Sequence, residues 1–132
     1  MQLQRGYRND RTRIPEAILM KIVDNLSIKE LKEMAEKMYG GLVKVDVDVA
    51  KSIVIVDMEM HADGEAELLK KGSKQVDLWG INIYPDKFGT DDFIEFDSMI
   101  NIKPRQNNRN RGIEDNVTRS KIKEIIAGVI NE

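Results

Sequence analysis

The residues best suited to chemistry lie in one short basic segment, residues 103–112. This segment contains Lys103, Arg105, Arg109 and Arg111 and no carboxylate. The planar guanidinium group of arginine donates two parallel hydrogen bonds that match a phosphate or a carboxylate. Because such a composition adds nothing to a hydrophobic core, the segment is either a solvated connection or a site that receives an anion.

Amide side chains accompany these cations. Asn108 and Asn110 lie among the arginines, and Asn82 and Asn101 each stand at the centre of an Ile-Asn-Ile-x-Pro pattern. An amide group donates neutral hydrogen bonds to phosphates, sugars or base edges. If the two Ile-Asn-Ile segments are neighbouring strands, their asparagines extend the polar surface of the basic segment. The sequence therefore predicts a loop that binds a phosphate-bearing ligand, such as RNA or a nucleotide.

The overall charge limits the size of such a ligand. The chain has 21 basic and 23 acidic residues, a net charge of −2 and a pI near 5.6. Tight binding to a duplex draws on a broad positive face, and only 5% of the residues are aromatic and suited to base stacking. A nucleotide or a single-stranded turn fits better. The alternative is a solvated loop whose arginines pair with the acidic stretch at 86–97.

A second set of candidates, His61, Asp63 and Glu65, combines an imidazole with two carboxylates at alternating positions. In a continuous strand these side chains share one face, where nitrogen and oxygen ligands would suit the divalent cation of a hydrolase. However, Asp63-Gly64 is a favoured turn dipeptide that breaks this alignment, and His61 is the only histidine. A polar strand end followed by a turn is the alternative explanation.

Several other chemistries lack the residues that they need. The chain contains no cysteine, which excludes disulfides, thiol nucleophiles and cysteine-ligated metals. It also has no Gly-x-Ser-x-Gly elbow, no dinucleotide fingerprint and no P-loop. The sequence therefore favours a binding module over an enzyme, and no cofactor is expected. A subunit that contacts a protein partner through an edge strand or its acidic surface is a third hypothesis, and the oligomeric state stays open.

Two amphipathic helices are predicted around these candidates. Ser27 and Glu30 form a capping box before apolar residues at helical spacing, and Gly40 and Gly41 end this helix. Asp115 is the expected N-cap of the second helix. The apolar stripe of that second helix consists of Ile122, Ile125, Ile126 and Val129.

The strands are predicted from alternation and from short apolar runs. Residues 42–49 alternate valines with Lys44, Asp46 and Asp48, which predicts a strand with one face in water. The other strands are expected at 20–24, 53–60, 81–83 and 100–102, and residues 93–96 are either a further short strand or the start of the last one. Residues 62–76 resemble a loop with at most one helical turn at 65–70. Trp79 is expected in the core.

These elements predict a single α+β domain with the order β-α-β-β-β-β-α. Its two helices would lie on one face of a mixed or antiparallel sheet. The domain is expected over 20–132, with 1–19 as a disordered extension; a helix from Pro15 to Val23 is the alternative to a strand there. The apolar runs are far shorter than the ~20 residues that cross a bilayer, and no signal peptide is visible, so a cytoplasmic location is expected.

Two stretches carry a resemblance to a known family. They are GSKQVDLWGINIYP at 72–85 and IEFDSMINIKPRQNNRNRG at 94–112. The short segment His61-Ala-Asp63 is part of the same resemblance. The chain resembles a family of small prokaryotic proteins described only as a domain of unknown function. The resemblance runs from about Met20 to the C-terminus. It implies one compact domain and carries no assigned activity.

Overall fold

A five-stranded antiparallel sheet with the order β1-β4-β3-β5-β6 forms the centre of the computed structural model, which describes residues 20–38 and 40–132. Its strands are β1 (Lys21–Val23), β3 (Val43–Asp48), β4 (Ile53–Val56), β5 (Leu78–Ile83) and β6 (Ile94–Glu95). Two further short strands, β2 (Leu26–Ser27) and β7 (Ile130–Asn131), pair in parallel outside this sheet. The strand predicted after Met20 is confirmed by β1. The competing helix is wrong over 21–23, and its first part, 15–19, lies outside the described residues.

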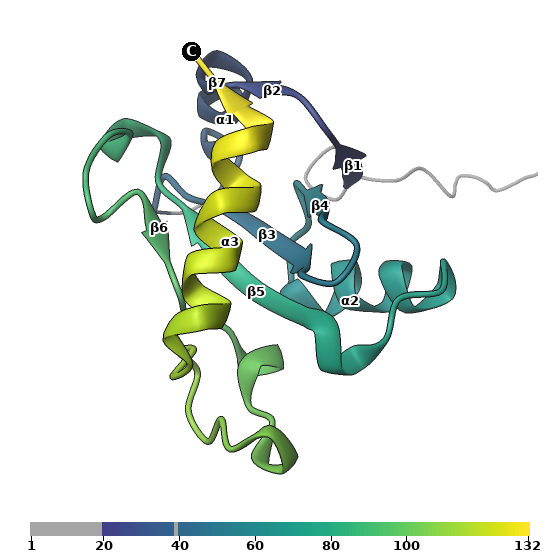
Figure 1. Ribbon diagram of the computed structural model, residues 1–132. Coiled ribbons are helices and arrows are strands. Elements are labelled where there is room, and N and C mark those ends of the chain that lie inside the picture. The colour runs from purple at the N-terminus through teal and green to yellow at the C-terminus, as the bar shows by residue number, and fades with distance from the viewer. Residues whose placement is uncertain (1–19, 39) are drawn as a thin grey trace, which may run out of the picture.

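Three α-helices cover the two faces of the sheet (Figure 1). They are α1 (Ile28–Ala35), α2 (His61–Lys70) and α3 (Asn116–Val129). The main core joins α1 and α3 to the side chains of Val43, Val45 and Val47. A smaller core, which includes Ile55, Leu78 and the α2 residue Leu68, lies on the opposite face. The predicted α+β fold with two helices on one face of an antiparallel sheet is confirmed.

Local capping explains where the two predicted helices begin. Ser27 Oγ accepts a hydrogen bond from the Glu30 amide at 3.0 Å, and Glu30 Oε1 accepts one from the Ser27 amide at 2.9 Å. Asp115 accepts a hydrogen bond from the Thr118 amide at 3.2 Å at the start of α3. These bonds satisfy amide groups that have no partner inside their helix. Both predicted caps are confirmed.

The loop predicted over 62–76 is wrong in its first half, because α2 spans His61–Lys70. This helix covers the face of β3 that alternation placed in water, so Asp46 and Asp48 are fully buried. The buried positions His61, Gly64 and Leu68 have helical spacing, which is the signal that the turn dipeptide Asp63-Gly64 obscured. Helix packing against the sheet has overridden the local turn preference.

The strand predicted at 100–102 is also wrong, since residues Met99–Asn101 form a 3₁₀ helix, η4. The reason is the side chain of Asn101, which makes the hydrogen bonds to the β5 backbone that a neighbouring strand would otherwise make. Its Oδ1 accepts a hydrogen bond from the Gly80 amide at 2.8 Å, and its Nδ2 donates to the Gly80 carbonyl at 2.9 Å. The repeated Ile-Asn-Ile pattern therefore has two different structures, a strand at 81–83 and the end of the 3₁₀ helix Met99–Asn101 in the second copy.

Candidate functional site

The basic loop, residues 103–112, closes on itself between η4 and α3. Its base is an isolated β-bridge between Lys103 and Asn108, whose amides and carbonyls exchange hydrogen bonds at 2.7 and 3.1 Å. Between them, Pro104–Gln106 form a short 3₁₀ helix that ends at Asn107 in the left-handed conformation, with φ of 61°. The sequence forms a tight turn here because proline suits the first position of such a helix and asparagine tolerates positive φ.

Asn108 holds the loop together from the inside. Its Nδ2 donates to the carbonyls of Asn101 and Gly112, both at 2.7 Å, and its Oδ1 accepts from the Glu114 amide at 2.8 Å. Only 3% of Asn108 is exposed and Asn101 is fully buried. Both asparagines thus bind the protein's own backbone in this structure and do not present their amides on the surface.

Lys103 anchors the same loop to the beginning of β5. Its Nζ donates to the Leu78 carbonyl at 2.5 Å and to the Gln75 carbonyl, and it lies 4.3 Å from the centre of the Trp79 ring. Burial lowers the pKa of Lys103 from 10.5 to about 8, against the opposing charges of Glu65 and Asp77. Lys103 therefore anchors the loop to β5 and is not part of the loop's exposed surface.

Arg105 and Arg109 are the two exposed cations of the loop that pair with no carboxylate, whereas the exposed Arg111 pairs with Asp97. Neither guanidinium group has an ion pair or a hydrogen bond within 20–38 and 40–132. Asn110 lies beside them, where its Nδ2 donates to Glu114 Oε2 at 3.1 Å and its Oδ1 accepts from the Gly112 amide at 2.9 Å. The loop thus displays two unpaired arginines on a backbone that hydrogen bonds hold in one shape.

The start of α3 does not favour an anion in this structure. A hollow of about 380 Å³ lies between the loop and the helix, and its lining includes Trp79, Gln106, Glu114 and Asp115. Hydrogen bonds from the Thr118 hydroxyl and amide lower the pKa of Asp115, so this carboxylate is ionised at neutral pH. The positive end of the helix dipole is therefore already neutralised by an acidic cap.

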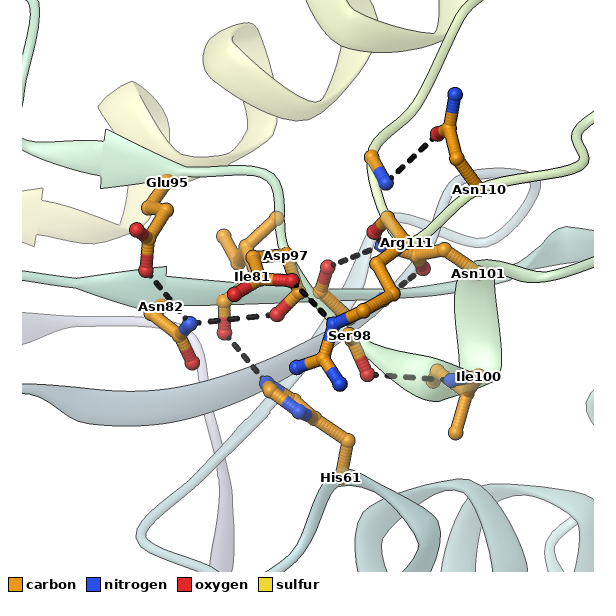
Figure 2. A network of polar contacts seen from close by, with 12 residues as sticks. His61, Ile81, Asn82, Glu95, Asp97, Ser98, Ile100, Asn101, Asn110 and Arg111 are labelled. Atoms are coloured by element: carbon orange, nitrogen blue, oxygen red, sulfur yellow. Dashed lines mark hydrogen bonds and ion pairs between the residues drawn. The ribbon is translucent and has the colours of Figure 1, made fainter.

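A second polar site lies on the sheet face that carries α2, and it is shown in Figure 2. We define this His61 cluster as His61, Asn82, Glu95, Asp97 and Arg111. His61 is the first residue of α2, is 8% exposed and forms a hydrogen bond from Nε2 to the Ile81 carbonyl at 2.8 Å. Since a carbonyl oxygen only accepts, Nε2 carries the proton and Nδ1 keeps a free electron pair.

Electrostatics keep this imidazole neutral. Burial lowers the pKa of His61 below its usual 6.5, and Lys44 and Arg111 lower it further. The hydrogen bond to Ile81 and the charge of Asp97 act in the opposite direction without reversing the shift. At neutral pH, His61 is therefore a hydrogen-bond acceptor at Nδ1.

The rest of the cluster is a chain of paired polar groups. Arg111 Nε donates to Asp97 Oδ1 at 2.6 Å. Asn82 Nδ2 donates to Glu95 Oε1 at 2.9 Å and to the Asp97 carbonyl at 3.3 Å, but the buried Oδ1 of Asn82 has no partner among the described residues. Figure 2 shows the guanidinium group of Arg111 extending from Asp97 towards the His61 ring.

The structure therefore divides the residues that the sequence proposed. Asn82 and Arg111 join His61 in one cluster, whereas Arg105, Arg109 and Asn110 lie on the exposed loop. Sequence reasoning considered Asp97 as a partner of His61 but missed Glu95, which joins the cluster through Asn82, although the two acids alternate along the same segment and so point to one side.

The proposed metal ligands His61, Asp63 and Glu65 follow the spacing of a helix, so they do not share one face as they would in a strand. Across the part of the chain that the structure describes, no group of three or more metal-ligating side chains is arranged to hold an ion. The geometry therefore adds no support to a metal-dependent hydrolase.

The fold and the two polar sites define a small α+β domain with a hydrogen-bonded basic loop. Residues 20–129 match the model of a family described as "Protein of unknown function (DUF5674)", and the chain belongs to this family. The predicted likeness to a family of unknown function, beginning near Met20, is thus confirmed. No curated protein and no solved structure matches the chain. Among the described helices, none has the length and apolar character to span a bilayer.

Proposed function

We propose that this domain binds a phosphate-bearing ligand, single-stranded RNA or a nucleotide, and that Arg105 and Arg109 pair with its phosphate. The observation that supports this function is the exposure of both guanidinium groups, which have no partner within the described ranges. Arg111 and Lys103 are less suited to the same task, because Asp97 pairs with the first and backbone carbonyls with the second.

The internal hydrogen bonds of Asn108 favour such binding because they fix the backbone that carries the two arginines. A preordered loop loses less conformational entropy when its ligand arrives. Trp79 contributes no stacking surface, since it is 5% exposed and its ring faces Lys103. The interaction is therefore mainly electrostatic, so it should weaken as the salt concentration rises.

Fluorescence anisotropy with a labelled, mixed-sequence RNA oligonucleotide tests this function. The double variant Arg105→Ala/Arg109→Ala should bind about tenfold or more weakly, as expected when charge-assisted hydrogen bonds are lost. Removal of two phosphate contacts should also reduce the slope of log K against log salt by about 1.4.

Lys29→Ala/Lys123→Ala is the matched control, because it removes the same charge from exposed positions on α1 and α3. Its affinity should stay close to that of the wild type, and both double variants should melt as the wild type does. Equal losses of RNA affinity in the two double variants would show that net charge alone explains the binding and would overturn the proposal. Full affinity in Arg105→Ala/Arg109→Ala would overturn it as well.

A further inference from the structure

The His61 cluster combines anion-binding donors with an unused acceptor in one place. Arg111 has a half-exposed side chain, and only its Nε is engaged, by Asp97. Its terminal nitrogens have no partner within the described part of the chain, and Figure 2 shows them on the side of the His61 ring. They are therefore available to donate two hydrogen bonds to an oxyanion.

Two further features around Arg111 add positive potential. Lys44 is paired with Asn82 in the register of β3 and β5, and it is close enough to influence the pKa of His61. The ten-residue helix α2 begins at His61, and its N-cap, Met60, supplies no side-chain acceptor. The first amides of α2 thus have no side-chain cap, although the Asp63 amide donates to the Met60 carbonyl at 3.0 Å and the Asp63 carboxylate lies in the same turn. Asp97 and Glu95 provide opposing negative charge, so the cluster is nearly neutral overall.

The acceptor of the cluster is Nδ1 of His61. His61 is 8% exposed and its ring lies against β5, where a Cβ atom on Gly80 would come within 3.0 Å of its Cδ2. The Ile81 carbonyl fixes the tautomer, and no described residue donates to Nδ1. A ligand held here by Arg111 would therefore meet a lone pair that repels a bare oxyanion and favours an O–H group.

We propose that the His61 cluster is a binding site for an oxyanion that keeps a proton, namely hydrogen phosphate or the monoanion of a phosphomonoester. Two of its oxygens accept hydrogen bonds from Arg111 and from the first turn of α2, and its P–O–H donates to His61 Nδ1. Sulfate and phosphodiesters carry no such proton near neutral pH, so the acceptor selects against both. This site is separate from Arg105 and Arg109 and does not depend on the function proposed for them.

The single histidine of the chain provides a direct probe, because its imidazole gives one set of ring signals in NMR spectra. The ring should be followed at pH 7 and constant ionic strength during titration with inorganic phosphate, methyl phosphate, dimethyl phosphate or sulfate. We expect a saturable shift with inorganic phosphate and at least about tenfold weaker binding of sulfate and dimethyl phosphate. Binding of methyl phosphate as well would assign the site to a terminal phosphate group, and binding of inorganic phosphate alone would assign it to the free ion.

Variants separate this site from the basic loop. Arg111→Gln should weaken phosphate binding about tenfold, and Lys44→Gln, which keeps the Arg111–Asp97 pair, should weaken it less. Arg105→Ala/Arg109→Ala should leave the His61 shift unchanged even if it abolishes RNA binding. Equal affinity for phosphate and sulfate, the absence of a saturable shift, or full affinity in both Arg111→Gln and Lys44→Gln would overturn the proposal.

Discussion

The carboxylate of Asp46 lies directly against Gly64, so that a Cβ atom on this glycine would overlap Asp46 Oδ2. This contact joins the middle of β3 to the middle of α2. Both oxygens of Asp46 and one oxygen of Glu65 are buried there without a hydrogen-bond partner among the described residues. An unpartnered buried carboxylate is much less costly when it is protonated. Burial, with help from the charge of Glu65, accordingly raises the pKa of Asp46 well above its usual value.

The raised pKa of Asp46 predicts an unusual dependence of stability on pH. The folded state holds a proton that the unfolded state releases above about pH 4, so the free energy of unfolding should fall as the pH rises, by at most about 1.4 kcal/mol per pH unit. Asp46→Asn should remove this loss and become more stable relative to the wild type between pH 4 and 8. Urea denaturation across this range measures the effect.

Asp91→Asn is the control for this prediction, since Asp91 is an exposed aspartate. Its stability curve should run parallel to that of the wild type. A parallel curve for Asp46→Asn as well would show that Asp46 is ionised in the folded protein.

The close contact at Gly64 predicts opposite effects for two helical glycines. Gly64→Ala adds a methyl group that meets Asp46 and lies 2.7 Å from Met58 Cε, and overpacking of this kind costs about 1–3 kcal/mol. A Cβ atom on Gly128 in α3 would meet no atom within 4 Å beyond its chain neighbours and the backbone of its own helix, so Gly128→Ala should stabilise the protein by about 0.5–1 kcal/mol. Thermal and urea unfolding test both variants, and a stabilised Gly64→Ala would contradict the tight packing of α2.

The internal position of Asn108 predicts that it matters for stability more than its loop location suggests. Asn108→Ala removes three short hydrogen bonds and leaves buried backbone groups without partners, so it should destabilise the fold by about 2–4 kcal/mol. Asn107→Gly is the control, since Asn107 has a φ of 61° that glycine adopts freely. Calorimetry should show a large decrease in Tm for the first variant and little change for the second. Equal, small changes in Tm would mean that the hydrogen bonds of Asn108 do not stabilise the loop.

The lowered pKa of Lys103 predicts a second window of pH dependence. Between about pH 8 and the unfolded value of 10.5, the unfolded chain binds a proton that the folded chain has lost. The wild type should therefore gain stability relative to Lys103→Met as the pH rises through this window. Trp79 lies 4.3 Å from the lysine and is the only tryptophan, so its fluorescence should titrate with a midpoint near pH 8. A flat fluorescence profile up to pH 10 would contradict the buried position of the ammonium group.

Local interactions made much of this fold predictable. The capping box of Ser27 and Glu30, the Asp115 cap and the apolar stripe of α3 all lie within a few turns of helix, so their spacing appears directly in the chain. The alternation of valines likewise defined β3 and its core face. Such patterns reflect nearest neighbours in one element, and the folded structure retains them.

The sequence alone determined the α+β class, two of the three helices, the family and the residue types of the candidate sites. Only the tertiary structure decided which cations are free. Lys103 is fixed by a carbonyl 25 residues away and Arg111 by a carboxylate 14 residues away, whereas Arg105 and Arg109 remain exposed. It also decided that α2 buries Asp46 and brings His61 to Arg111. These outcomes depend on packing between distant segments, and no local pattern of residues encodes such contacts.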